Sequence, residues 1–138
     1  MTVYAGETLI AIDDKGRRLA LQAGESCNVQ GSFYNGDTAI AKVALASVKA
    51  WLYDEETGVS INSRKDQDIL DANGGTIDAD GVLTVRLEPA DNVIVGTVEV
   101  DAIETHILRV KWTWNDGVAV RTGTQQVRLY IQQIQTVT

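Results

Sequence analysis

The sequence predicts an all-β fold, an antiparallel sandwich of about seven to nine short strands in one domain. Along most of the chain, apolar and polar residues alternate with a period of two, whereas a helix would give a period near 3.6. Turn-forming Gly, Asp and Asn separate the alternating segments at short, regular intervals. The 138 residues, of which 44% are hydrophobic, suffice for one domain with its own core.

Three strand candidates occupy the N-terminal part of the chain. Residues 2–12, TVYAGETLIAI, precede the break DDKG, and residues 17–21, RRLAL, precede a short polar stretch. Residues 26–34, SCNVQGSFY, end at the turn signal NGD. In this third strand Cys27 shares a face with Phe33, and no cationic neighbour in the sequence would activate its thiol. We therefore expect Cys27 to be a small buried residue.

The middle of the chain continues the pattern. Residues 44–54, ALASVKAWLYD, contain good helix formers, but their strict alternation favours a strand. Residues 59–64, VSINSR, predict a short polar strand at a sheet edge. Residues 76–87, TIDADGVLTVRL, predict two strands joined by an Asp-Gly turn, and residues 88–92, EPADN, predict a corner that holds the only proline.

A long hairpin is predicted at the C-terminal end. Residues 105–117, THILRVKWTWNDG, alternate almost throughout, and residues 118–134 follow their Asp-Gly turn as a second strand. His106 lies in register with the apolar residues of the first strand, and Trp114, close to the turn, is expected to be half exposed. The inward-facing residues of the central strands form the expected core, which comprises Val48, Ala50, Leu52, Leu83, Val85, Leu87, Leu108, Val110, Trp112, Val127, Leu129 and Ile131.

Charge and composition exclude several classes of function. The net charge of −7 opposes nonspecific nucleic-acid binding, which requires a basic surface. No apolar stretch approaches the roughly 20 residues that span a bilayer, so no membrane role is expected. The N-terminal stretch lacks the cationic start and apolar run of a signal peptide, and the single cysteine suits a reducing compartment. We expect synthesis in the cytoplasm.

The sequence offers little for catalysis or for a cofactor. His106 is the only histidine, no nucleophile elbow is present, and we expect His106 to make a structural hydrogen bond near a sheet end. One His and one Cys do not predict a structural zinc site. The loop that contains Asp66, Asp68, Asp71 and Asn73 could be solvated or could hold a hard cation, and its spacing differs from that of an EF-hand. No enzyme, catalytic residue, metal or cofactor is therefore predicted.

Several segments together resemble the immunoglobulin-like domains of tailed-bacteriophage virion proteins. They are LALQAGESCNVQGSFY, VKAWLYDEETG, NGGTIDADGVLTVRLEPADN, ETHILRVKWTWNDG and VRLYIQQI, and they span roughly residues 19 to 134. The resemblance implies an immunoglobulin-like domain over 19–138 and a non-enzymatic structural role in the virion. A capsid decoration (cement) protein is the first expectation, and a tail or baseplate component the second. A carbohydrate-binding β-sandwich module remains a further alternative.

Residues 1–18 precede the part of the chain that carries the resemblance. They predict one more strand in the same sheet, or an arm that adds a strand to a neighbouring subunit. The apolar residues of such an arm are Val3, Tyr4, Leu9, Ile10 and Ile12. Decoration proteins of this kind tend to form trimers, so the resemblance implies a homo-oligomer, with capsid or tail proteins as partners.

The outward side of the central strands predicts a contact face. If residues 47–54, 105–114 and 126–134 are neighbouring strands, one surface combines cations with aromatic residues. Its members are Lys49, Trp51, Tyr53, Arg109, Lys111, Arg128 and Tyr130. Aromatic residues and Arg are enriched in protein interfaces, although cross-strand pairs on a solvated sheet would give the same pattern. We expect this face to bind a neighbouring subunit or an acidic partner.

Overall fold

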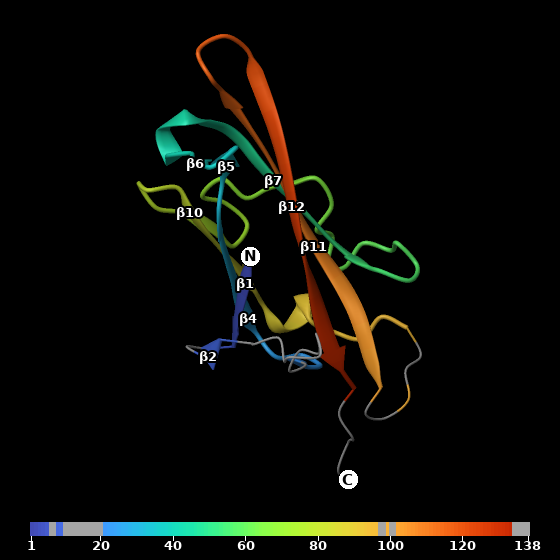
Figure 1. Cartoon of the computed structure of the whole chain (residues 1–138). Coiled ribbons are helices and arrows are strands. Elements are labelled where there is room, and N and C mark those ends of the chain that lie inside the picture. Colours follow the sequence, from blue (N-terminus) through green and yellow to red (C-terminus); the bar gives the residue numbers. More distant parts are fainter. Residues whose placement is uncertain (6–7, 10–20, 97–98, 100–101, 134–138) are drawn as a thin grey trace.

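A computed structural model of the chain describes residues 1–5, 8–9, 21–96, 99 and 102–133. These residues form two five-stranded sheets and a small hairpin, arranged as an all-β sandwich, which confirms the predicted fold class (Figure 1). Among the described strands, seven have three or more residues. None of the helices in the described part of the chain has the length and apolar character needed to span a bilayer.

The first sheet has the strand order β2-β1-β4-β10-β9, and all its neighbouring strands are antiparallel. Its strands are β1 (Thr2–Ala5), β2 (Thr8–Leu9), β4 (Cys27–Ser32), β9 (Gly75–Ile77) and β10 (Val82–Leu87). Strand β4 is central because β1 and β10 pair with its two edges, and Cys27 at its start is buried as predicted.

The second sheet has the order β3-β12-β11-β7-β8, in which only the β3–β12 pair is parallel. Its strands are β3 (Leu21–Gln22), β7 (Leu45–Asp54), β8 (Gln67–Asp68), β11 (Ile103–Asn115) and β12 (Val120–Gln132). The predicted hairpin of β11 and β12 is present, and its turn projects beyond the rest of the molecule at the top of Figure 1. The second sheet therefore contains the three longest strands.

Short elements connect the two sheets. The hairpin of β5 (Tyr34–Asn35) and β6 (Thr38–Ala39) forms at the predicted NGD turn. A 3₁₀ turn, η1 (Lys42–Ala44), leads into β7, and a second, η2 (Pro89–Asp91), makes the predicted proline corner. In η2 the Glu88 and Asp91 side chains cap each other's backbone N–H groups, so this corner is fixed by its own sequence.

The core lies between the two sheets and agrees closely with the prediction. All the expected core residues are buried except Val127, which is partly buried and packs against the others. The prediction for Trp114 was wrong, since its side chain is only 7% exposed. A register shift between Thr113 and Trp114 places Trp114 opposite Leu45, which is also buried, so the core extends toward the hairpin turn.

The predicted edge strand over residues 59–64 is a loop instead. Only Ser60 makes a β-bridge, with Tyr53. Asn62 and Ser63 have φ angles of 52° and 59°, which lie outside the strand region. The Asn62 side chain donates a 2.9 Å hydrogen bond to Asp91 Oδ1, a contact made with a distant part of the chain. Tertiary contacts therefore override the local alternation here.

The beginning of the predicted arm is a strand of the chain's own first sheet. In the β1–β4 pair, Val3 lies opposite Val29 and Tyr4 opposite Asn28. This corresponds to the first of the two alternatives for residues 1–18. Ile10 and Ile12 lie outside the described residues, so exchange of an arm between subunits stays a prediction.

The turn between β9 and β10 depends on Gly81. Its φ is +84°, and a Cβ atom built there would lie 2.1 Å from the carbonyl oxygen of Ile40. We expect Gly81→Ala to lower the free energy of unfolding by about 1–3 kcal/mol, measured by urea denaturation. Alanine is strained at this positive φ, and its Cβ atom would also overlap the carbonyl oxygen of Ile40. Gly36→Ala is the matched control, since Gly36 has a φ of +62° but no atom near its added Cβ. Equal losses in the two variants would show that the overlap with Ile40 is unimportant.

Candidate functional site

The outward face of the second sheet brings the predicted contact residues together on three adjacent strands. Lys49, Trp51 and Tyr53 come from β7, Arg109 and Lys111 from β11, and Arg128 and Tyr130 from β12. The strand register places Arg109 opposite Trp51 and Lys111 opposite Lys49. The sequence indicated the composition of this face on the condition that these strands are neighbours, and the strand order fulfils that condition.

Two of the four cations of this face are paired with carboxylates within the chain, which the sequence did not reveal. Arg128 forms an ion pair with Glu55, with its Nε 3.0 Å from Oε1, and this carboxylate raises the pKa of Arg128. Lys49 Nζ lies 3.6 Å from Asp66 Oδ1. The exposed face is consequently less electropositive than the list of its cations suggests.

Arg109 makes two contacts along the face. Its guanidinium carbon lies 5.8 Å from the centre of the Tyr53 ring, and its Nη2 donates a 3.2 Å hydrogen bond to Gln126 Oε1. Stacking of this kind is worth roughly 0.5–1 kcal/mol at an exposed site. Arg109 therefore connects an aromatic residue of β7 with a polar residue of β12.

Ile107 is the residue of this face that sequence reasoning missed. It points to the same side as Arg109, yet its side chain is only 2% exposed and is not part of the core between the sheets. Its cross-strand neighbours are Tyr53 and Arg128, whose long side chains can cover it. An isoleucine in a row of cations was the available signal. Ile107 therefore forms a small apolar centre beneath the long side chains of this face.

A shallow groove of about 500 Å³ runs across one end of the face. Its lining residues are Ser47, Lys49, Trp51, Asp66, Lys111 and Thr113. The hydroxyl groups of Ser47 and Thr113 lie 2.5 Å apart and hydrogen-bond to each other. The groove thus combines one aromatic ring with ammonium, carboxylate and hydroxyl groups.

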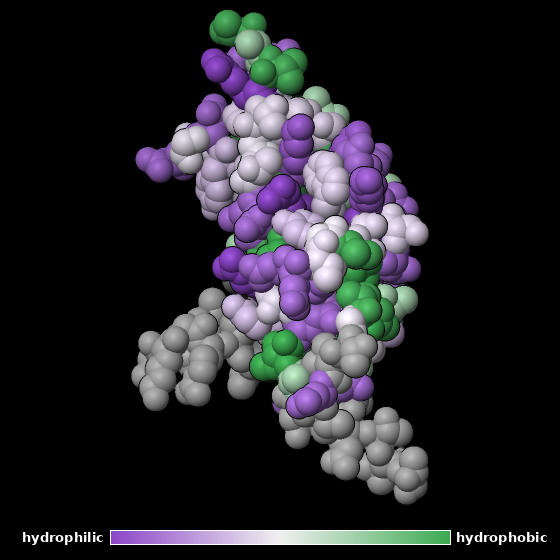
Figure 2. All heavy atoms as spheres, turned by 90° about the vertical axis from the view of Figure 1, so that its right-hand side faces the viewer, coloured by the Kyte–Doolittle hydropathy of each residue, from purple (hydrophilic) through white to green (hydrophobic). Residues whose placement is uncertain are grey.

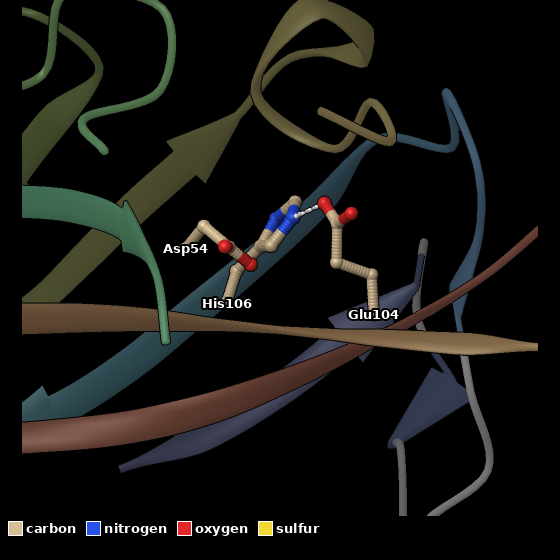
Figure 3. A group of neighbouring side chains, drawn as sticks. All are labelled: Asp54, Glu104 and His106. Atoms are coloured by element: carbon tan, nitrogen blue, oxygen red, sulfur yellow. Dashed lines mark hydrogen bonds and ion pairs between the residues drawn. The ribbon is translucent and has the colours of Figure 1, made fainter. Parts of the chain in front are cut away.

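A second cluster of functional groups lies at the opposite end of the same sheet, on its inner side. His106 of β11 is the cross-strand partner of Asp54 in β7, and Glu104 precedes His106 by two residues on the same face of the strand. Figure 3 shows the imidazole between the two carboxyl groups. All three side chains are buried, and one potential metal-ligand atom from each lies within 4.8 Å of the others.

The carboxylates of this cluster are held by hydrogen bonds. Glu104 Oε1 is 2.5 Å from His106 Nε2 and accepts from the Val95 N–H at 2.9 Å, while Oε2 accepts from the Gly96 N–H at 3.0 Å. Burial alone would raise the pKa of Glu104, but the hydrogen bonds from His106 and from the two backbone groups outweigh burial and lower it. Glu104 is therefore ionised near neutral pH.

Asp54 is fixed in a similar way at the end of β7. Its Oδ2 accepts from the Thr57 N–H at 3.0 Å and from the Thr57 hydroxyl at 2.7 Å. A cavity of about 530 Å³ adjoins the cluster. Its lining residues are Asp54, Glu55, Glu56, Thr57, Gly96, Ile103, Glu104 and Thr105. Four carboxylates therefore face this cavity.

The sequence predicted only part of this arrangement. The hydrogen bond of His106 at a sheet end is present, as expected. The roles of Glu104 and Asp54 were missed. The spacing of Glu104 and His106 by two residues in a strand was a signal for one shared face. The pairing with Asp54 depends on the register of β7 against β11, which the sequence does not reveal.

The acidic loop around Asp66–Asn73 uses its carboxylates within the chain. Asp66 is paired with Lys49, and Asp68 Oδ1 accepts from the Leu70 N–H at 2.9 Å. Asp71 pairs with Lys42, and this hydrogen bond, aided by one from the Ile77 N–H, lowers the pKa of Asp71. Within the described residues, only Asp54, Glu104 and His106 bring three potential ligand atoms together.

Comparison of the chain with protein families, with curated proteins and with solved structures found no match.

Proposed function

We propose that the protein is a non-enzymatic structural component of a tailed-phage virion that acts through protein–protein contacts, in the first place as a capsid decoration protein. A tail or baseplate component is the alternative location. The composition of the outward face of the second sheet is the observation that supports a role in protein–protein contacts. There, three adjacent strands present Trp51, Tyr53 and Tyr130 among cations and around a buried Ile107.

The strand order supports the immunoglobulin-like part of the proposal. The order β1-β4-β10-β9 in one sheet and β12-β11-β7 in the other agrees with the A-B-E-D and G-F-C orders of immunoglobulin sandwiches. Domains of this architecture serve many unrelated functions, so the order supports the resemblance and not a particular role.

The β11–β12 hairpin offers two further contact features. Figure 2 shows a mostly hydrophilic surface with hydrophobic residues at the projecting tip, where Val118 and Val120 are 90% and 65% exposed. Among the described strands, none pairs with the outer edge of β12 along residues 120–127. Of the residues that commonly protect edges from pairing, this stretch carries only Arg121, whose side chain is paired with Asp116. A partner could add a strand here.

The contact role is tested by variants of the outward face. We expect the purified protein to form a homo-oligomer, with a trimer favoured, and Trp51→Ala and Arg109→Glu to reduce its mass in light scattering to that of a monomer. Matched controls are Tyr34→Ala and Arg86→Glu, which change exposed residues of β5 and of β10 in the first sheet and should leave the mass unchanged. Variants of Trp51 and Arg109 that assemble like the parent would contradict the proposal.

A carbohydrate-binding module is the second candidate, favoured by the groove beside Trp51. An aromatic ring can stack on a sugar, and Asp66 could accept hydrogen bonds from sugar hydroxyls. Lys49 and Lys111 in the same groove weaken this interpretation, since such sites favour amides and carboxylates. Specific binding on a glycan array, abolished by Trp51→Ala, would favour this candidate over the virion role.

A further inference from the structure

One ring nitrogen of the only histidine has no partner among the described residues. His106 is completely buried, and its Nε2 contacts Glu104, but its Nδ1 makes no hydrogen bond to any of them. A buried polar atom without a partner costs about 1–3 kcal/mol, so native structures rarely leave one unsatisfied. Three other buried side-chain atoms of the described residues also lack a partner, namely Asn92 Oδ1, Trp112 Nε1 and Trp114 Nε1, but of the four only the His106 nitrogen belongs to a cluster with two carboxyl groups. An additional group is therefore expected at Nδ1.

The hydrogen bonds of Glu104 determine which imidazole nitrogen of His106 is free to bind the additional group. The two carboxylate oxygens of Glu104 already accept from the backbone N–H groups of Val95 and Gly96, and this acceptor geometry makes Glu104 an acceptor toward the imidazole as well. His106 must then donate from Nε2, and in the neutral ring Nδ1 carries a lone pair. A histidine that donates one N–H to a carboxylate and offers its other nitrogen is the usual arrangement of a metal-binding imidazole.

Asp54 supplies a second potential metal ligand beside His106. Both hydrogen bonds from Thr57 go to Oδ2, which leaves Oδ1 for a ligand. Two ligand atoms bound to one transition-metal ion lie roughly 3–4.4 Å apart. One potential ligand atom of each of Asp54, Glu104 and His106 lies within 4.8 Å of the others, so the side chains are close enough for rotations to bring His106 and Asp54 to one ion.

We propose that Asp54 and His106 bind a divalent first-row transition cation, with Glu104 orienting the imidazole and water from the adjoining cavity completing the coordination. The imidazole nitrogen favours Zn²⁺ and similar ions over Ca²⁺ and Mg²⁺, which prefer oxygen ligands only. Glu56 also lines the cavity and adds negative charge near the cation, whereas the charge of Glu55 is paired with Arg128. This inference does not depend on the proposed virion role.

The test uses Zn²⁺ and the full chain without an added histidine tag, after treatment with EDTA. Because His106 is the only histidine, ¹⁵N–¹H correlation spectra of the imidazole contain one set of ring signals. We expect one equivalent of Zn²⁺ to bind by calorimetry and to shift the Nδ1 resonance of His106. No binding, or binding that leaves the imidazole resonances unchanged, would overturn the proposal without any variant.

Variants then test the roles of the two carboxylates. We expect Asp54→Asn to abolish measurable Zn²⁺ binding and Glu104→Gln to weaken it by about 10–100-fold, as for other groups that orient a ligand. Asp68→Asn, in the exposed acidic loop, should bind Zn²⁺ like the parent. Circular dichroism in EDTA checks that each variant is folded. Binding by Asp54→Asn as tight as that of the parent would refute the assigned ligands.

Discussion

Replacing Trp112 by alanine is expected to lower the free energy of unfolding by about 3–5 kcal/mol. The indole is 6% exposed and lies at the inner side of the longest hairpin. Its ring centre is 5.2 Å from that of Phe33 in the facing part of the sandwich. Gly123 lies opposite in β12, where a Cβ atom would come within 2.5 Å of the indole. The neighbouring strand is thus shaped to the ring, and removal of the ring leaves a cavity.

Urea denaturation of the parent and the variant measures this loss as a lower midpoint at an unchanged slope. A domain is held by only about 5–15 kcal/mol, so the variant should lose a large fraction of its stability. Trp51→Ala is the matched control, since Trp51 lies on the outward face and should lose much less. Trp112→Phe should also be milder, because it retains a ring and removes an indole N–H that has no partner in the described part of the chain. A loss below about 1 kcal/mol for Trp112→Ala would contradict the packing described above.

The strands and the core could be predicted from the sequence because each depends on local alternation. In β7 and β11 one set of alternating residues is buried and the other faces outward, as the period of two requires. The turns at Gly36 and Gly81 were equally local, since both glycines have positive φ angles. A β-sandwich can bury the apolar faces of alternating strands in almost any strand order, so the fold class could be predicted without knowing which strands pair.

Features that depend on distant partners were not predictable. The loop at residues 59–64 alternates like a strand, but Asn62 is turned toward Asp91, which lies 29 positions away in the sequence. Trp114 was expected to be half exposed because the shift that places it opposite Leu45 is invisible in the sequence. The cluster around His106 likewise requires Asp54 from another strand. Local pattern identifies faces, whereas register and loop path decide which faces meet.

A buried ion pair between Arg64 and Asp91 joins the loop before β8 to the corner after β10. Arg64 Nε and Nη2 donate to the two oxygens of Asp91 at 2.7 and 3.0 Å. Asp91, which is fully buried, also accepts from Asn62 and from the Glu88 N–H. Arg64 Nη1 donates to Gln67 and to the carbonyl of Asn73, so one guanidinium orders several turns of this loop.

Removing one partner of this pair is expected to cost about 3–5 kcal/mol, because the other charge remains buried without compensation. Arg64→Ala and Asp91→Asn should both show this loss in urea denaturation. The exposed pair of Arg86 and Glu88 has the same 2.7 Å separation and supplies the control, since Arg86→Ala should cost less than about 1 kcal/mol. Similar losses for Arg64→Ala and Arg86→Ala would mean that burial of the Arg64–Asp91 pair contributes nothing.

The pH dependence of stability gives the same pair a second, independent signature. Burial would raise the pKa of Asp91, but the hydrogen bonds from Arg64, Asn62 and Glu88 outweigh it and lower the pKa below its ordinary value of 3.8. The unfolded chain therefore binds this proton more readily than the folded one. The stabilisation is complete well above pH 3.8 and is lost as the pH falls through the lowered folded value. The stability curves of the parent and of Asp91→Asn should accordingly converge in acid, and a constant difference down to pH values far below 3.8 would show that folding does not lower the pKa of Asp91.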